Sequence, residues 1–553
     1  MLSSDRLMIA ASILAILILT IYPVLALARY AIGGEGSPTI RYFNELFTND
    51  FYAQVLMNTI YLATTSIALS SLLGISFAWI LTRTNVLFRS FLETALIVPF
   101  FVPPLVGVLS WILLVGPQGL LDFVSRRLFE TAVSFPIYSQ WGIVLVNALE
   151  YVPMIFMFSS NTLKSMDPSL EEASLMSGAG TFQTAIRVTL PVSAPGVLSG
   201  IIIAYTLSLG MFAAPLLLGT GKGIFTIATL VYELINHSPP NYAQASALSI
   251  WLAVIAVATV LLQRRVLGAR KFVTVTGKGF RSHVIDLKTR KYPVSCVCIM
   301  FAAINLAPII ALILASLMRY YSFDALLNTL SFTLENYKLI LLEYPAAARS
   351  IYNSLLLAFS GATLGIALSF MMAFIAVRMK ARGSELLDYA NFIPLALPTA
   401  IFGAGLLEAW IYSPIRLYGT LWILLMGYLG YYNLFGYRAM TSGLAQIHPE
   451  LEEASTLSGA SFLKTLRSIM VPLLKPAILT GWLFLFISML RDISVSIFVY
   501  SFGSEVMSVE LLAIWDSGGF APSAALALVQ TGIIFGAVYV MQRILGADIS
   551  SIV

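Results

Sequence analysis

Charged side chains inside long apolar runs are the residues of this sequence most able to do chemistry. Arg491 and Asp492 interrupt the run FISMLRDISVSIFVY, and an ionised group in such a run costs about 2.5 to 3.5 kcal/mol when it enters a membrane. Adjacent residues of a helix do not face each other, so each needs its own partner or water. This indicates a polar translocation pathway, although hydrogen bonds between helices would satisfy the pair equally well. Glu150 and Glu408 are weaker pathway candidates, because their counterparts in the internal repeat described below are uncharged.

The sequence lacks the patterns of an enzyme or a metal site. Lys222 in GTGKGIF and Lys278 in TGKGF are each followed by Gly and do not complete a phosphate-binding loop. No nucleophile, base and orienting group are placed together, so we expect no enzyme on this chain. The three His and two Cys residues are not spaced as metal ligands. We therefore expect neither a metal nor a cofactor on this chain.

The composition makes lipid the main solvent of the chain. Of the 553 residues, 59% are hydrophobic and 11% are charged, and the mean hydropathy is +0.88. A water-soluble globule cannot cover its surface with so few polar groups, and disordered or collagen-like chains are not dominated by apolar residues. The sequence therefore predicts an all-α polytopic membrane protein, in which each spanning helix satisfies its own backbone.

Twelve apolar runs reach the length of about 20 residues that a membrane-crossing helix needs. The predicted spans are residues 7–29, 55–81, 91–115, 141–160, 192–218, 246–263, 293–318, 351–377, 386–412, 420–443, 477–500 and 522–542. The first run resembles a cleavable signal peptide, but its apolar stretch exceeds a signal core and we expect it to be retained. With a cytoplasmic N-terminus, 22 Lys and Arg residues face the cytoplasm and 9 face the other side, so both termini are expected in the cytoplasm.

The two halves of the chain repeat each other. The segment that begins at Asp167 recurs from His448 at an offset of 281, whereas upstream residues such as Asn58 and Asn353 match at an offset of 295. The second half is therefore 14 residues shorter, and this difference falls in the outside loop between the third and fourth spans. Six spans per half make both halves enter the membrane from the same side, as a parallel repeat.

We predict a first six-span half at residues 1–264, a basic cytoplasmic linker at 265–292 and a second six-span half at 293–553. The stretch from Arg264 to Lys291 carries nine Lys and Arg residues against the single acid Asp286. We expect a plain loop that is retained in the cytoplasm. The alternative is that its basic residues bind anionic lipid headgroups.

The repeated loops, residues 167–191 and 448–472, are the least membrane-like parts of each half. Asp167 and His448 are each expected to cap a short helix whose first turn is acidic. Gly178 and Gly459 permit the left-handed residue that ends this helix, and a second short helix follows. A proline then marks the start of the next span. The residues that make up this repeated pattern of acids, alanine, glycine and proline are Glu171, Glu172, Ala173, Gly178, Pro191, Glu452, Glu453, Ala454, Gly459 and Pro472.

One face of each loop helix is available for docking on another protein. Leu170, Ala173 and Ser177 share this face in the first loop at helical spacing. A passive helix at the lipid interface is the alternative. Two copies in register over 34 positions favour docking, because a passive loop would seldom remain so similar.

The repeated loops resemble a known motif. The segments Glu172-Ala173-Ser174 with Gly178 and Leu190-Pro191, and their second-half equivalents, are similar to the EAA loop of the membrane subunits of ATP-binding cassette (ABC) importers. The resemblance implies that each loop forms a coupling helix seated in a cytoplasmic ATPase subunit. The implied partners are two copies of the ATPase, which would carry ATP and Mg, and an extracellular or periplasmic solute-binding protein.

The resemblance covers nearly the whole chain and is to the fused, two-half members, such as ferric-iron and thiamine permeases of prokaryotic cell membranes. The first-half segments NTIYLATTSIALSSLLGISFAWILTRT and VPFFVPPLVGVLSWILLVGP are particularly similar to the iron-type members. This favours ferric iron as the solute. Thiamine, polyamine, phosphonate and sulfate importers share the same permease features and stay open as alternatives.

Prolines interrupt the third span of each half. Pro99 and Pro103 in the first half match Pro394 and Pro398 in the second. Such breaks are tolerated where neighbouring helices or a water-lined cavity satisfy the freed carbonyl groups. We expect gate hinges at these positions, with a static kink as the alternative.

Two other classes of membrane protein fit part of the pattern. A gradient-driven secondary transporter also uses two six-span halves, and Asp492 could then couple transport to an ion. This class gives no reason for the paired acidic loops. A structural scaffold explains the repeat but gives no reason for charge within a span.

Overall fold

The computed structural model consists of helices joined by turns and short loops over the residues that it describes, which are 2–33, 39–131, 135–167, 169–268, 285–323, 332–379, 387–388, 390–391, 393–394, 397–411 and 413–545. Within these ranges no strand forms, and one isolated bridge pairs Thr84 with Ile285. The predicted all-α polytopic class is confirmed. Most of the predicted basic linker lies outside the described residues.

Ten helices of the described residues are long and apolar enough to cross a membrane, two fewer than the predicted spans. They are Met8–Ala31, Asp50–Arg83, Pro104–Phe129, Gln140–Ser165, Thr181–Leu209, Tyr242–Thr259, Lys288–Ser316, Pro345–Met379, Phe462–Leu490 and Phe520–Ile544. The two predicted spans outside this set differ in kind. The ninth contains a short apolar helix, α20 (Thr399–Trp410). The tenth is α21 (Leu421–Gln446), whose 26 residues include four tyrosines, an asparagine and an arginine.

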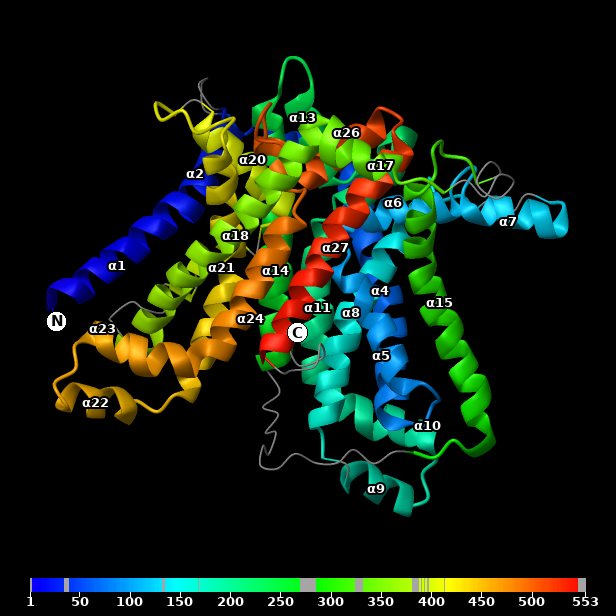
Figure 1. The fold of residues 1–553 in the computed structure, drawn as a ribbon, viewed down its shortest axis with the longest axis horizontal. Helices are drawn as coiled ribbons and strands as arrows, with labels where there is room; N and C mark the ends of the chain where they lie inside the picture. The colour runs from blue at the N-terminus through cyan, green and yellow to red at the C-terminus, as the bar shows by residue number, and fades with distance from the viewer. Residues whose placement is uncertain are drawn as a thin grey trace. The chain divides into compact units, whose positions relative to one another are not determined.

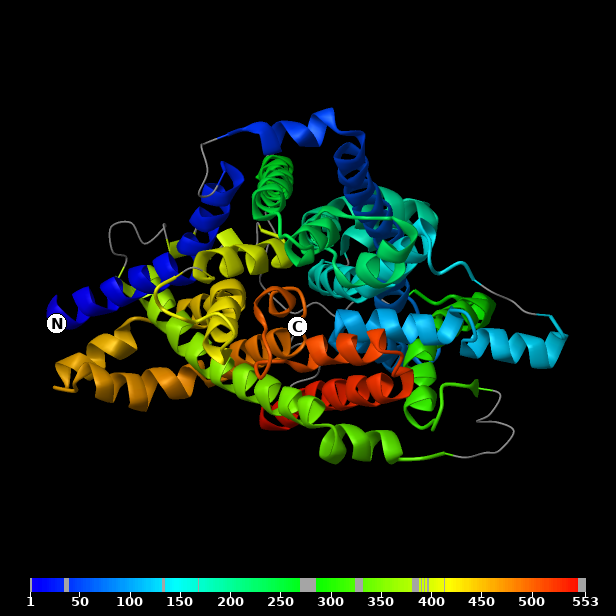
Figure 2. The same cartoon turned by 90° about the horizontal axis from the view of Figure 1, so that it is seen from above.

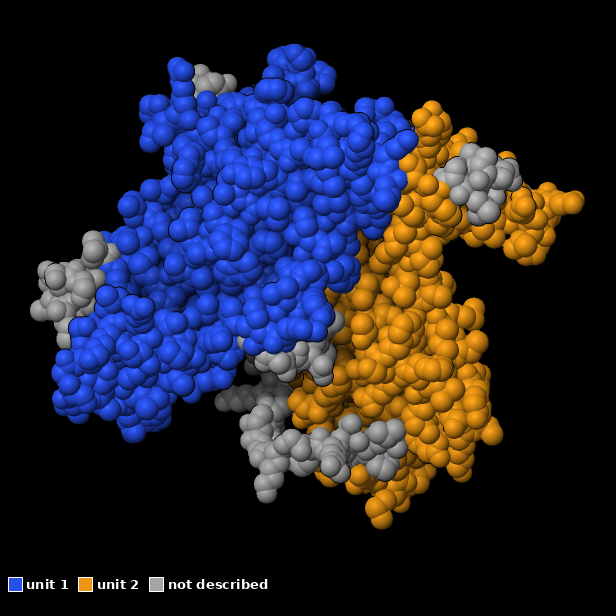
Figure 3. Space-filling view, viewed as in Figure 1, with its two compact units in different colours: residues 1–49, 230–253, 334–552 blue, residues 50–229, 254–333, 553 orange. Residues whose placement is uncertain are grey.

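The chain forms two compact units, which are coloured separately in Figure 3. Unit 2 comprises residues 50–229 and 254–333. Its helices, all but α12 labelled in Figure 1, are α4 (Asp50–Arg83), α5 (Arg89–Ile97), α6 (Pro104–Val115), α7 (Leu120–Phe129), α8 (Gln140–Ser165), α9 (Ser169–Met176), α10 (Thr181–Thr184), α11 (Leu190–Leu209), α12 (Ala213–Leu218) and α15 (Lys291–Ser316). The α13 (Ile227–Asn236) and α14 (Tyr242–Gly268) helices contribute to both units.

Unit 1 comprises residues 1–49, 230–253 and 334–552. Besides α20 and α21, its helices are α1 (Leu2–Ile16), α2 (Tyr22–Ala31), α3 (Arg41–Thr48), α17 (Glu335–Lys338), α18 (Pro345–Phe374), α22 (Glu450–Leu457), α23 (Phe462–Thr465), α24 (Val471–Leu490), α25 (Ser496–Val499), α26 (Met507–Asp516) and α27 (Phe520–Leu545).

The first helix of each sequence half packs on the core of the other half, so the compact units do not follow the sequence repeat. In unit 1, the Tyr22 hydroxyl of α2 donates a hydrogen bond of 2.9 Å to the carbonyl oxygen of Ala409 in α20. In unit 2, Phe301 of α15 stacks on Phe77 of α4, with ring centroids 4.3 Å apart. The predicted halves at residues 1–264 and 293–553 rest on the sequence repeat, and this division stays a prediction.

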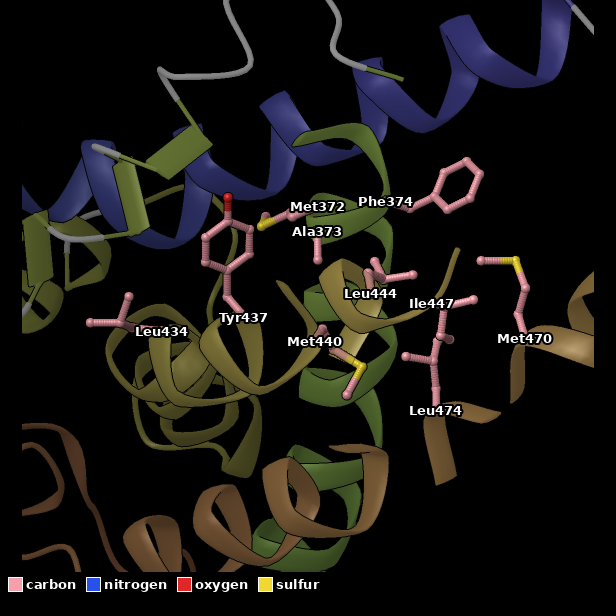
Figure 4. Packing of buried hydrophobic residues seen from close by; sticks show 10 residues of the cluster. All are labelled: Met372, Ala373, Phe374, Leu434, Tyr437, Met440, Leu444, Ile447, Met470 and Leu474. Atoms are coloured by element: carbon pink, nitrogen blue, oxygen red, sulfur yellow. The ribbon is translucent and has the colours of Figure 1, made fainter. Parts of the chain in front are cut away.

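A buried apolar cluster holds α18, α21 and α24 together in unit 1 (Figure 4). Its residues are Met372, Ala373, Phe374, Leu434, Tyr437, Met440, Leu444, Ile447, Met470 and Leu474. Ile447 and Met470 stand at the two ends of the segment that contains α22 and α23. The cluster therefore fixes the points at which the second repeated loop leaves and rejoins the helix bundle.

Candidate functional site

The two repeated loops have the same backbone plan. In the first loop, α9 ends before Gly178, which has φ +86°, and α10 leads through a π-helical turn, Ala185–Thr189, into α11. In the second loop, α22 ends before Gly459, which has φ +79°, and α23 leads through the π-helical turn Leu466–Met470 into α24. Both glycines therefore occupy the left-handed region that other residues rarely adopt.

Pro191 and Pro472 lie in the first turn of α11 and α24. Because proline has no backbone N–H, a regular α-helical hydrogen bond cannot form there. In each loop the π-helical turn stands directly before the helix that contains the proline. The second short helix of each loop and the following span are thus joined by one continuous helical path.

The caps of the two loop helices differ. In the first loop, the Ser169 N–H donates a hydrogen bond of 2.9 Å to the Asp167 carboxylate, as a capping residue requires. In the second loop, α22 begins at Glu450, and the residue before it, Pro449, makes no side-chain cap. The predicted capping role of His448 is wrong, because its imidazole Nδ1 instead lies 3.5 Å from the Glu450 carboxylate.

The first acid of the first loop is buried against the end of a span. Glu171 is 4% exposed, and its carboxylate lies 3.1 Å from the Nε of Arg83, the last residue of α4. Arg83 also donates a hydrogen bond of 2.9 Å to the carbonyl oxygen of Leu163 in α8. The Thr189 hydroxyl donates to the other Glu171 oxygen at 2.6 Å. These contacts bind α9 to the ends of α4 and α8.

The equivalent acid of the second loop has the equivalent partner. The Arg378 Nε donates a hydrogen bond of 2.7 Å to Glu452, and its Nη2 donates at 2.7 Å to the carbonyl oxygen of Ile447. Arg378 follows α18 in a π-helical turn, and Ile447 follows α21. The loop helix is thus attached to the ends of two long helices in each unit.

The second acid of each loop faces outward. Glu172, Ala173, Glu453 and Ala454 are exposed. Large apolar side chains project beside them: Leu170 is 45% and Met176 90% exposed, and the matching residues Leu451 and Leu457 are 45% and 89% exposed. Each loop helix therefore uses one acid to hold the membrane helices and presents the other on an exposed face with apolar residues.

Arg83 and Arg378 attach the loop helices to the long helices, a role that the sequence analysis does not predict, because the two arginines enter it only as indicators of topology. They match at the offset of 295, and the two acids match at 281. This pairing of a repeated basic residue with a repeated acid is the signal that could have identified them.

The Arg491-Asp492 pair does not lie in the middle of a helix, contrary to the sequence prediction. The α24 helix ends at Leu490, and α25 begins at Ser496. Both Asp492 oxygens accept hydrogen bonds: Tyr432 donates at 2.7 Å, the Ser496 hydroxyl at 2.7 Å and the Ser496 N–H at 3.0 Å. Asp492 therefore holds the start of α25 by hydrogen bonds where the span is broken, which a sequence scan for unbroken apolar runs could not detect.

Glu408 is buried in α20 of unit 1. It is 4% exposed and accepts a hydrogen bond of 2.5 Å from the Ser246 hydroxyl of α14. Pro398 stands directly before α20, and the Pro394 carbonyl oxygen accepts a hydrogen bond of 3.0 Å from the Leu397 N–H. The structure thus places the two prolines at a turn where α20 begins.

Glu150 belongs to unit 2, and it lines a cavity there together with Pro99, Pro103 and Asn305. The third span of this half is broken where α5 ends at Ile97, a short 3-10 segment follows, and α6 begins after Pro103. The structure therefore brings Glu150 together with the predicted hinge prolines of its own half, whereas Asp492 and Glu408 belong to the other unit.

The chain is similar to proteins of one transport family. The family described as "Binding-protein-dependent transport system inner membrane component" matches residues 70–268 and 365–550. The Ferric transport system permease protein FbpB of Actinobacillus pleuropneumoniae is 27% identical, over 95% of this chain and 76% of its own length. A Haemophilus influenzae protein, also named for ferric transport, is 29% identical over 91% of this chain and 79% of its own length.

Shorter proteins align with part of the chain. The Molybdenum transport system permease protein ModB of Escherichia coli is 28% identical over 38% of this chain and 90% of its own length. A crystal structure of a bacterial ABC transporter involved in the import of the acidic polysaccharide alginate aligns with 49% of this chain and 97% of that chain, at 21% identity and a TM-score of 0.43.

Proposed function

Because the chain belongs to the family of binding-protein-dependent transport system inner membrane components, we propose that it is the fused, two-half permease of an ATP-driven importer. The observation that carries this proposal is that the two neighbouring acids of each loop have different surroundings. Glu171 and Glu452 hold the loop helices on arginines of the membrane helices, and Glu172 and Glu453 are exposed beside apolar side chains. A helix fixed on one face and exposed on the other is suited to transmit motion from a docked subunit.

Transmission would follow from the contacts at the helix ends. A displacement of α9 would act through Arg83 on α4 and, through the Leu163 carbonyl, on α8. A displacement of α22 would act through Arg378 on α18 and on the end of α21. ATP hydrolysis, with its Mg, takes place in this proposal on two copies of a separate cytoplasmic ATPase, and a solute-binding protein delivers the solute from the opposite side.

Ferric iron is the solute that the relatives favour. Two relatives that cover most of the chain are named for ferric transport, whereas the molybdenum relative covers only 38% of it. In our proposal both termini of the chain lie in the cytoplasm, as the distribution of Lys and Arg predicts. Thiamine, polyamine, phosphonate and sulfate importers remain the alternatives that an assay with the binding protein would test.

Glu150 is the best-placed residue for the translocation pathway. Its cavity is shared with Pro99 and Pro103 at the break in the third span, so a hinge motion there would change the surroundings of the carboxylate. Asp492 is less suited to an ion-coupling role, because both of its oxygens already accept hydrogen bonds from Tyr432 and Ser496.

The proposal is tested by purifying the tagged chain from its native membrane in mild detergent, with nucleotide trapped, and identifying co-purifying chains by mass spectrometry. We expect two copies of an ATPase with a phosphate-binding loop for each permease. The matched variant carries Glu172→Lys and Glu453→Lys, which change only exposed acids, and should lose the ATPase while the permease remains folded. Full ATPase recovery with this double variant, or uptake that depends on an ion gradient and not on ATP, would contradict the proposal.

A further inference from the structure

The connection that makes the first half 14 residues longer than the second contains a separate helix, α7. Residues 116–139 join α6 to α8 in the first half, whereas only residues 411–420 join α20 to α21 in the second. The longer connection contains α7, which a turn at residues 116–119 separates from α6, so the candidate span Pro104–Phe129 consists of two helices. The shorter connection leaves no room for a helix of this length. Neither the repeat nor the repeated loops explain this addition.

One face of α7 is attached to unit 2. Phe123 forms a buried cluster with Met318 and Phe323, which follow the end of α15. Asp122 is 6% exposed and receives two hydrogen bonds from Arg126, at 3.0 and 2.8 Å. The helix therefore has a fixed orientation on the end of α15.

Another face of α7 is apolar and exposed. Leu121 is 38%, Val124 37% and Leu128 68% exposed. Their spacing of three and four residues places them on one side of the helix. Arg127, which is also exposed, stands at the edge of this apolar face. Besides the face that packs on unit 2, the helix therefore has an exposed apolar face with a basic residue at its edge.

The position of α7 coincides with the level at which α15 ends. The α15 helix stops at Ser316, and the guanidinium of Arg319 lies 6.0 Å from the ring centre of Tyr320, which is 75% exposed. Exposed tyrosine and arginine at the end of a spanning helix are typical of the boundary between lipid and water. One to two turns before this end, Ile310 and Ile313 of α15 are 53% and 42% exposed, as lipid-facing residues are expected to be.

The orientation of α7 also fits a position at the boundary between lipid and water. Within unit 2, Figure 1 shows α7 crosswise to α4 and α15, at the end of the unit opposite α9. Figure 2, turned by 90°, also shows α7 from the side along its full length. A helix crosswise to the spans at the level where they end lies in the plane of the membrane surface.

We propose that α7 is an interfacial helix, which lies in the membrane surface at the end of unit 2 opposite the first repeated loop and inserts Leu121, Val124 and Leu128 among the lipid chains. Arg127 lies at the headgroup level, where a cation is favoured beside phosphate. The partner of this face is the phospholipid bilayer and not the solute-binding protein. The anchor gives one half of the permease a fixed depth in the membrane.

Spin labels on the full chain, reconstituted in bilayer nanodiscs of phosphatidylethanolamine and phosphatidylglycerol, test this proposal. The chain has only two cysteines, Cys296 and Cys298, so their replacement by serine allows single labels at Leu128→Cys and, as the matched control on the preceding residue, Arg127→Cys. Relaxation by oxygen reports contact with lipid, and relaxation by a soluble nickel chelate reports contact with water. We expect oxygen to dominate at position 128 and the nickel chelate to dominate at position 127.

Three results would overturn the proposal. Access of the nickel chelate to position 128 equal to that at position 127 would show that the face is in water. Protection of position 128 from both reagents would show that protein covers it. Loss of water access only after the binding protein is added would identify the face as a protein docking surface. Quenching of a bimane label at position 128 by brominated lipid provides an independent measurement, because it requires direct contact between the label and the lipid chains.

Discussion

The two repeated loops place the same ion pair in different surroundings. In the first loop the Arg83 side chain is fully buried and the Glu171 side chain is 6% exposed, whereas Arg378 and Glu452 are 10% and 20% exposed. Thr189 supplies a further hydrogen bond to Glu171, and the equivalent residue of the second loop, Met470, cannot donate one. The repeat therefore preserves the ion pair but not the exclusion of water around it.

The end of α4 has a second attachment beside Arg83. The Ile285 N–H donates a hydrogen bond of 2.8 Å to the Arg83 carbonyl oxygen, and the Asn85 amide donates at 2.6 Å to the Asp286 carboxylate. The Leu287 N–H donates to the Asn85 amide oxygen at 2.9 Å. The end of the predicted basic linker is thus bound next to the residue that holds the first loop helix.

The largest expected effect is that of Arg83→Gln. This change leaves the Glu171 carboxylate buried without its cation, and breaking a buried pair costs about 3 to 5 kcal/mol. Thermal unfolding of the purified permease should show the loss, together with lower transport. Arg187→Gln, which removes an exposed arginine of the same loop, is the control and should leave the unfolding temperature unchanged.

Arg378→Gln tests whether burial decides the difference between the loops. Water can reach the more exposed Glu452 carboxylate, so we expect a loss of about 1.5 to 3 kcal/mol, as for a hydrogen bond to a charged group. The same unfolding measurement on both variants provides the comparison. Equal losses for Arg83→Gln and Arg378→Gln would show that the different burial has no energetic consequence.

Gly178→Ala and Gly459→Ala address a feature that the two loops share. Each glycine has a left-handed backbone, and no atom lies within 4 Å of the position that an alanine Cβ would occupy. The cost is therefore that of the backbone conformation alone, about 1 to 2 kcal/mol. We expect equal losses of ATPase coupling in the two variants, measured as solute transported per ATP hydrolysed. A large difference between them would contradict the equivalence of the loop geometries.

The smallest effect is expected at Asp286. The Lys288 N–H and the Asn85 amide donate to its carboxylate and hold its pKa below the usual Asp value. A lowered folded-state pKa stabilises the attachment above the unfolded-state pKa, and this stabilisation is lost as the pH falls through the folded-state pKa. Asp286→Asn should remove this pH dependence. Hydrogen exchange of the 285–290 peptide measures it, and exchange that is identical in the two proteins at every pH would contradict the attachment.

The sequence predicts the membrane class, the repeat and the two acidic loops, because each depends on local runs or on direct comparison of two segments. Apolar runs of sufficient length identify the spans, and Gly178 and Gly459 identify the turns by their spacing alone. The ion pair of Arg83 and Glu171 escapes such reasoning because 88 positions separate its members, and only the folded bundle brings them together.

Breaks within apolar runs are the second kind of feature that the sequence conceals. Asp492 lies in a continuous apolar stretch, and its hydrogen bonds to the start of α25 become visible only once α24 is seen to end at Leu490. Likewise, the 14 additional residues of the first half are evident in the sequence, but the direction of α7 depends on its packing against Phe323 and Met318.

The measurement that tests the central claim most directly is photo-crosslinking from the exposed faces of both loop helices in native membranes. A photoreactive amino acid at Met176 or Leu457, which are 90% and 89% exposed, samples the surface on which the ATPase would dock. We predict that each position crosslinks to a chain with a phosphate-binding loop, and that the same probe at Leu128 does not. Crosslinks from both loops to lipid alone, in membranes that sustain uptake, would contradict the assignment of the loops as coupling helices.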